Sequence, residues 1–213
     1  MPSSESSSSS SLSSSPSLGM LRAQQSRRVL LILDAQHAVL SPPPLGNPIP
    51  RAPTVLANLK HILATARGAS HPPQIVHIRN TGDRGELDEP SAPGWALALE
   101  PKVDEGEVVL DKRKNNAFSG TRLGEVISED AEVVVVGLQT DFSLRATCSA
   151  ALARGNSVLL IREAHGTYDR VEILYGGGVT PAKQVEKEIE DELEEAGVNL
   201  LGMEDVRAIF DDR

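Results

Sequence analysis

The chain is poor in cysteine, in aromatic residues and in positive charge. It has one cysteine in 213 residues, so no internal disulfide can form and a reducing, cytoplasmic environment is expected. Aromatic residues make up 3% of the sequence, and the core must therefore be built from aliphatic side chains. The net charge of −9 argues against nucleic acid as a partner, because phosphates require a basic surface.

Several familiar patterns are also missing. No apolar run approaches the roughly 20 residues that a membrane span needs, and the N-terminus lacks the basic-then-apolar order of a secretory signal. Neither a glycine-rich dinucleotide fingerprint nor a P-loop occurs, so no nucleotide cofactor is expected. Residues 77–89 offer one histidine and several acids but no second histidine, a spacing that does not make a metal site. The sequence predicts no cofactor, no metal and no membrane span.

Serine dominates the N-terminus. Residues 1–18 contain 12 serines and two prolines, and residues 1–25 are therefore expected to form a disordered tail. Arginines follow at positions 22, 27 and 28, so import into an organelle stays open as an alternative to the cytoplasm. Residues 26–213 are predicted to form one folded domain.

Beyond the tail, short aliphatic runs alternate with helical stretches. Continuous β-branched and aliphatic runs are typical of strands that are buried on both faces of a parallel sheet. We expect an α/β fold, a doubly wound, mostly parallel six-stranded sheet with helices on both faces, of Rossmann-like type. The expected strands are residues 29–33, 74–78, 108–110, 133–136, 157–161 and 198–201, and the expected helices are 54–67, 121–128, 144–153, 182–196 and 204–210.

Polar residues follow three of these strands. Asp34 closes the first, where a poorly solvated carboxylate serves either as a turn cap or as a general base, with Gln36 close by. Lys112 and Lys114 follow the third, where a lysine is either a surface charge or the partner of such a carboxylate. Ser143 lies at the turn after the fourth, where the first N–H groups of a helix can hold an anion.

Four segments carry a resemblance to a known family. Residues 31–36 (LILDAQ) end a strand in Asp-x-Gln, residues 112–121 (KRKNNAFSGT) place Phe and then Gly-Thr after a lysine, and residues 137–143 (GLQTDFS) resemble a Gly-x-x-Thr-Asp-x-Cys turn. Residues 163–169 (EAHGTYD) resemble a further segment of one subgroup. In this order, the segments resemble the isochorismatase-like cysteine hydrolase superfamily over residues 28–210.

The resemblance implies a site for a small-molecule substrate. It assigns Asp34 as base, Lys112 rather than Lys114 as electrostatic partner, and Ser143 to the position of the nucleophile. It also implies a cis peptide between Leu138 and Gln139, with the N–H groups of Gln139 and Ser143 directed at the substrate oxygen. Homo-oligomers are implied as well. Gln36, Trp95 and Phe118 are expected to contact the substrate.

The chain departs from the family pattern at the nucleophile. Ser143 replaces the cysteine, and a serine hydroxyl ionises several pKa units above a thiol. Cys148 lies five residues further along the helix and points about 140° away, so we expect a buried structural thiol. Serine hydrolases commonly use a histidine base, and His37 or His165 could assist Ser143 or simply line the pocket.

Two functions follow from these residues. One is a hydrolase of a small amide, imide or vinyl ether that uses an Asp-Lys-Ser variant of the Asp-Lys-Cys site. The alternative is a catalytically inactive relative that binds a small molecule or a protein partner. Retention of Asp34 and Lys112 favours a working or ligand-binding site.

Overall fold

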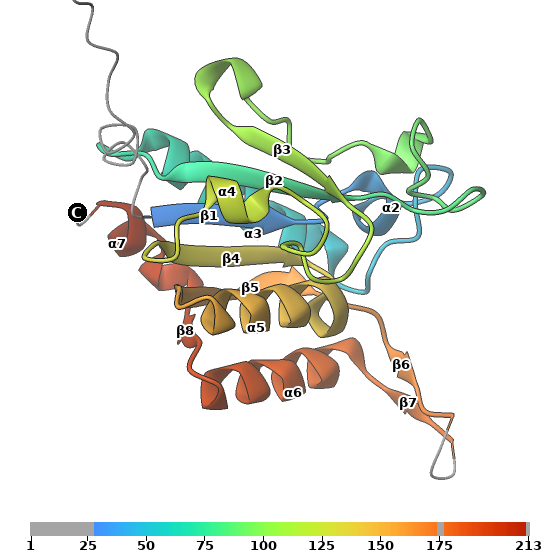
Figure 1. Cartoon of the computed structure of the whole chain (residues 1–213). Helices are drawn as coiled ribbons and strands as arrows, with labels where there is room; N and C mark the ends of the chain where they lie inside the picture. The colour runs from blue at the N-terminus through green and yellow to red at the C-terminus, as the bar shows by residue number, and fades with distance from the viewer. Residues whose placement is uncertain (1–27, 174–176, 212–213) are drawn as a thin grey trace, which may run out of the picture.

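The computed structural model describes residues 28–173 and 177–211, so the serine-rich segment 1–25 lies outside the described residues. A six-stranded sheet forms the centre of the molecule (Figure 1). Its strands are β1 (Arg28–Leu33), β2 (Gln74–Asn80), β3 (Val108–Lys112), β4 (Glu132–Leu138), β5 (Ser157–Gly166) and β8 (Asn199–Leu201).

All neighbouring strands of this sheet run parallel, in the order β3-β2-β1-β4-β5-β8. From β1 the chain proceeds outward through β2 to β3 and then returns to the other side of β1 with β4. The connection therefore changes direction between β1 and β4, where ligands usually bind at the carboxyl ends of the strands. The doubly wound α/β fold is confirmed.

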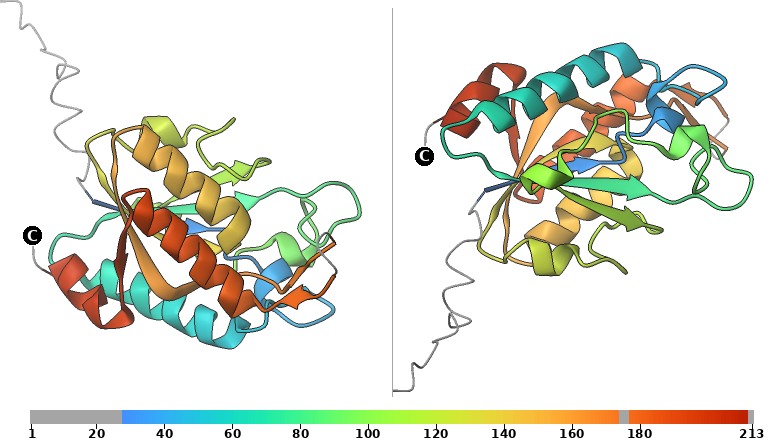
Figure 2. Two further views of the ribbon diagram at one scale, coloured as in Figure 1. Left: turned by 90° about the horizontal axis from the view of Figure 1, so that it is seen from below. Right: turned by 90° about the horizontal axis from the view of Figure 1, so that it is seen from above.

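Alternating residues of β1 divide the core into two layers. Leu30 and Ile32 pack toward α3 (Ala52–Gly68) and α7 (Val206–Asp211), whereas Leu31 and Leu33 face the other layer. Figure 2 shows α3 and α7 on one side of the sheet and α4 (Leu123–Val126) and α5 (Arg145–Ala153) on the other. The side chains of α6 (Ala182–Glu195) join the second layer. Both faces of the sheet are thus buried, as its aliphatic strands predict.

Gly137 allows β1 and β4 to approach each other at the switch point. Its φ of +117° lies in a region that L-residues rarely adopt, and a Cβ at this position would overlap the backbone of Leu33. The glycine therefore brings the end of β4 against the end of β1, from which two of the predicted site residues follow.

Some elements differ from the sequence-based expectation. The helix expected over 121–128 is reduced to the four residues of α4, and the Thr121 hydroxyl accepts a hydrogen bond from the Leu123 N–H in the turn that precedes it. A π-helical turn over Thr140–Leu144 precedes α5. The short α2 (His37–Leu40) and the two-stranded arm of β6 (Arg170–Val171) and β7 (Val179–Thr180) lack a sequence periodicity long enough to predict them.

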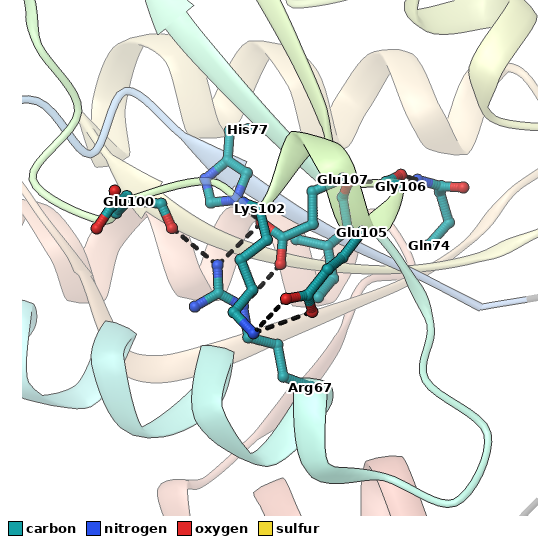
Figure 3. Close-up of polar contacts among 9 residues, drawn as sticks. Arg67, Gln74, His77, Glu100, Lys102, Glu105, Gly106 and Glu107 are labelled. Carbon is teal, nitrogen blue, oxygen red and sulfur yellow. Dashed lines mark hydrogen bonds and ion pairs between the residues drawn. The ribbon is translucent and has the colours of Figure 1, made fainter.

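A polar cluster ties the last turn of α3 to the start of β3 (Figure 3). The Glu107 carboxylate accepts hydrogen bonds from Arg67 at 2.7 Å and from the Lys102 N–H at 2.9 Å, and it lies 2.9 Å from Nε2 of the buried His77. These partners outweigh burial and lower the pKa of Glu107 to about 2, while burial lowers the pKa of His77. An ionised carboxylate and a neutral imidazole thus anchor the edge of the sheet.

Candidate active site

A cavity of about 240 Å³ opens at the carboxyl ends of β1, β2 and β4. It lies at the switch point of the sheet, between the segments that follow these strands. Its walls combine carboxylates, amides and apolar side chains. The lining residues are Asp34, Gln36, Ala38, Val39, Asn80, Asp88, Asn115, Leu138, Gln139, Phe142 and Ser143.

Asp34 enters this cavity directly from β1. Its φ of +48° is a left-handed conformation, which aspartate tolerates better than most residues, and its N–H donates to the Ile78 carbonyl of β2. The residue is 7% exposed, and burial raises the pKa of the carboxyl against the opposing effect of Lys112. Oδ1 is buried and has no hydrogen-bond partner among the described residues. This oxygen can accept a proton or a substrate N–H.

Lys112 is the lysine that reaches Asp34. Alternation along β3 buries Lys112, whereas the preceding Asp111 pairs with Arg79 at the surface. The Lys112 ammonium lies 2.7 Å from Oδ2 of Asp34. It also donates to Oγ of Ser143 at 2.9 Å and to Oδ1 of Asn80 at 3.2 Å. Three acceptors thus satisfy its three N–H groups.

Ser143 is held between β4 and α5. It belongs to the π-helical turn at the amino end of α5, is 5% exposed and lines the cavity. The peptide between Leu138 and Gln139 is cis, which confirms that prediction. Asp34, Lys112 and Ser143, which come from three separate strand ends, therefore meet at one point; their chemical roles remain predictions.

The Gln36 side chain connects the end of β2 to the loop around Trp95 at the edge of the cavity. Its side-chain amide donates to the backbone carbonyls of Asn80 at 3.1 Å and Trp95 at 3.0 Å, and its oxygen accepts from the Asn80 N–H at 2.8 Å. Gln36 lines the cavity as expected, but these bonds occupy the amide. The residue thereby positions Asn80 and the loop around Trp95.

The two aromatic residues expected in the pocket wall do not line the cavity. The Arg79 guanidinium lies over the Trp95 ring, with Cζ 3.5 Å from the ring centroid. The Arg154 guanidinium lies over the Phe118 ring, with Cζ 4.8 Å from the ring centroid. Phe118 also packs against the core layer that contains Leu31 and Leu33 of β1. Each of the two rings stacks with an arginine, and Phe142 is the aromatic residue among those that line the cavity.

The candidate histidines have partners other than Ser143. His37 Nδ1 lies 2.7 Å from the Ser41 hydroxyl. The buried His165 places Nδ1 at 3.0 Å from the Thr140 hydroxyl and Nε2 at 3.2 Å from Glu190. Within the described part of the chain, neither histidine has a hydrogen bond to Ser143, so Asp34 and Lys112 are the ionisable groups in place beside it.

Cys148 lies inside the core layer that covers one face of the sheet. It is fully buried, and burial raises the pKa of its thiol to about 12. This placement confirms the expected structural thiol. A thiol of this kind ionises too little to act as a nucleophile.

Asn80, Asp88 and Asn115 were missed by the sequence analysis. Asn80 is the last residue of β2, so attention to polar residues at the end of the second strand would have found it. Asp88 and Asn115 reach the cavity from loops, and no local pattern distinguishes them from other surface residues.

Residues 28–173 and 177–211 contain neither a candidate metal site nor a candidate membrane-spanning helix. No group of three or more histidine, cysteine, aspartate or glutamate residues could hold a metal ion. No helix in these residues combines the length and the apolar character needed to cross a membrane.

Comparison with known proteins identifies several similar chains. The isochorismatase domain model matches residues 28–173. A streptothricin hydrolase of Streptomyces noursei is 34% identical over 144 residues, which cover 67% of this chain and 55% of that protein. A second streptothricin hydrolase of the same organism is also 34% identical, with 50% of its length covered. The chain spans about half the length of the curated relatives it matches.

Solved structures share the fold. An isochorismatase from Pseudomonas putida is 28% identical with a TM-score of 0.74, over 84% of this chain and 89% of that one. A pyrazinamidase of Pyrococcus horikoshii in complex with zinc is 19% identical with a TM-score of 0.63, over 83% of this chain and 99% of that one. The latter likeness concerns the fold alone.

Proposed function

Since the chain belongs to the isochorismatase family, we propose that it is a hydrolase that cleaves a small amide, imide or vinyl ether with Ser143 as nucleophile. The observation that carries this proposal is the position of the Lys112 ammonium, 2.7 Å from the Asp34 carboxylate and 2.9 Å from the Ser143 hydroxyl. A base, a cation and a nucleophile in contact form the arrangement that nucleophilic catalysis requires.

For an amide, the reaction begins when Oγ of Ser143 attacks the carbonyl carbon. Asp34 takes the hydroxyl proton, and the N–H groups of Gln139 and Ser143 hydrogen-bond the developing oxyanion. The C–N bond then breaks, the proton on Asp34 moves to the leaving nitrogen, and an ester remains on Ser143. Water, deprotonated by Asp34, attacks this ester and regenerates the hydroxyl as the acid departs.

The environment of Asp34 supports a serine nucleophile. A hydroxyl ionises several pKa units above a thiol, so its proton must leave during the attack rather than before it. Burial raises the pKa of Asp34 and strengthens it as a base, and Oδ1 has no competing partner among the described residues. Lys112 stabilises the negative charge that forms on Oγ.

Steady-state turnover of a panel of small amides, imides and vinyl ethers tests the proposal. The wild type should hydrolyse at least one compound, and Ser143→Ala should lower kcat by about 1000-fold or more. Cys148→Ala provides the matched control and should retain turnover. An inactive wild type with an active Ser143→Cys variant would refute a catalytic serine. Inactivity of both, with a metabolite still bound, would favour the inactive binding protein.

A further inference from the structure

The cavity contains a second carboxylate that the proposed reaction does not use. Asp88 comes from the loop after β2 and lines the same cavity as Asp34 and Ser143. Its Oδ2 accepts a hydrogen bond from Nδ2 of Asn80 at 2.6 Å. Its Oδ1 lies against Gly82, where a Cβ would overlap the carboxylate. Asp88 is therefore held in a defined orientation at the cavity wall.

The charge of Asp88 lacks a cationic partner among the described residues. The other acid in the cavity wall, Asp34, pairs with Lys112, so this pair is neutral as a whole. Arg84, the nearest arginine in sequence, is exposed and forms no ion pair with Asp88 among the described residues; Arg79 pairs with Asp111, and Arg113 lies 3.4 Å from the exposed Asp83. The cavity thus carries one uncompensated negative charge.

Asn80 links this charge to the reacting groups. Its Oδ1 accepts from Lys112, and its Nδ2 donates to Asp88. A chain of three hydrogen bonds therefore runs from Ser143 through Lys112 and Asn80 to Asp88. When the carbonyl group of a small substrate lies at Ser143, another part of the same molecule can reach Asp88.

We propose that Asp88 binds a cationic group of the substrate, an ammonium or a guanidinium, while the scissile carbonyl lies at Ser143. This proposal rests on the proposed function and names its substrate class. A buried or partly buried carboxylate attracts a cation more strongly than water does when the cation also gains hydrogen bonds. Val39 and Phe142 provide apolar surface for the carbon chain between the two groups.

A matched pair of amides tests the proposal. In 4-aminobutanamide and pentanamide, an ammonium and a methyl group occupy the same place, so the ratio of their kcat/KM values isolates the effect of the charge. The wild type should prefer 4-aminobutanamide, and Asp88→Asn should lower the ratio by about tenfold, equivalent to about 1.4 kcal/mol. Asparagine keeps the shape of the side chain and an acceptor for Asn80.

Asp83→Asn is the control, because it removes the same charge from an exposed position of the same loop. It should leave the ratio within about twofold, since exposed charges at longer range are screened. The proposal is refuted if the wild type does not favour the cationic amide, if Asp88→Asn leaves the ratio unchanged, or if Asp83→Asn lowers the ratio as much.

Binding separates this proposal from the proposed hydrolysis. Titration calorimetry on Ser143→Ala, with and without Asp88→Asn, measures the ratio of the two dissociation constants without turnover. If neither amide is hydrolysed but the cationic one binds preferentially through Asp88, the proposed hydrolysis of such amides fails and the assignment of Asp88 holds. If the wild type hydrolyses both amides without preference, hydrolysis holds and the assignment of Asp88 fails.

Discussion

Cys148 allows a test of which side chains lie in the core and which line the cavity, because it is the single cysteine of the chain and lies near Ser143 in sequence. Burial raises the pKa of its thiol from 9.0 to about 12, a shift that corresponds to about 4 kcal/mol for ionisation in place. At about pH 8 the thiolate fraction falls from about one tenth to about one ten-thousandth. The folded protein should therefore react with thiol reagents about 1000-fold more slowly than an accessible thiol.

A chromogenic aromatic disulfide measures this difference directly. In denaturant, the wild type should release one equivalent of chromophore rapidly, and under native conditions release should be slow. Ser143→Cys should add one fast equivalent under native conditions, because the new thiol lines the cavity beside Lys112. Cys148→Ala, combined with Ser143→Cys, should retain that fast equivalent. Native wild type that reacts as fast as the unfolded chain would refute the assignment of Cys148 to the core.

Three further variants test residues that hold the fold together around the sheet. Glu107→Gln should lower the free energy of unfolding by about 3 kcal/mol near neutral pH, because the folded pKa of about 2 lies below the ordinary 4.5. In the wild type this contribution to stability is present above about pH 4.5 and is lost as the pH falls through about 2. Urea denaturation followed by circular dichroism measures the free energy of unfolding. Glu105→Gln, at an exposed position, is the control. Gly137→Ala should lower the melting temperature far more than Gly120→Ala, whose positive φ is not combined with a backbone overlap; equal shifts would contradict the close approach of β1 and β4. Gln36→Leu should cost about 3 kcal/mol by leaving three backbone groups unpaired, and a loss below about 0.5 kcal/mol would contradict its role in connecting β2 to the loop around Trp95.

Most of the sheet was predictable because its strands are buried on both faces. Such strands are continuous aliphatic runs, and their parallel arrangement places all carboxyl ends at one edge. Asp34, Lys112 and Ser143 lie at or just after three of these ends, so strand order and the family motifs were sufficient to predict that their side chains lie together. Short elements such as α2 and β6 contain too few residues for a period to be recognised.

The walls of the cavity were less predictable. Trp95 and Phe118 are aromatic, but neither is among the residues that line the cavity, and each ring stacks with an arginine. Asp88 reaches the cavity because its loop folds back along Gly82 onto Asn80. Contacts of this kind depend on loop geometry, which composition and spacing do not specify.

Nucleophilic catalysis by Ser143 requires a covalent ester on this residue during turnover. Rapid quenching of the wild type with p-nitrophenyl acetate or a hydrolysed amide, followed by intact-mass and peptide analysis, measures this most directly. We predict one acyl group, located on Ser143, absent from Ser143→Ala and present in Cys148→Ala. Turnover that persists in Ser143→Ala, or an acyl group that maps to another residue, would rule out Ser143 as the nucleophile.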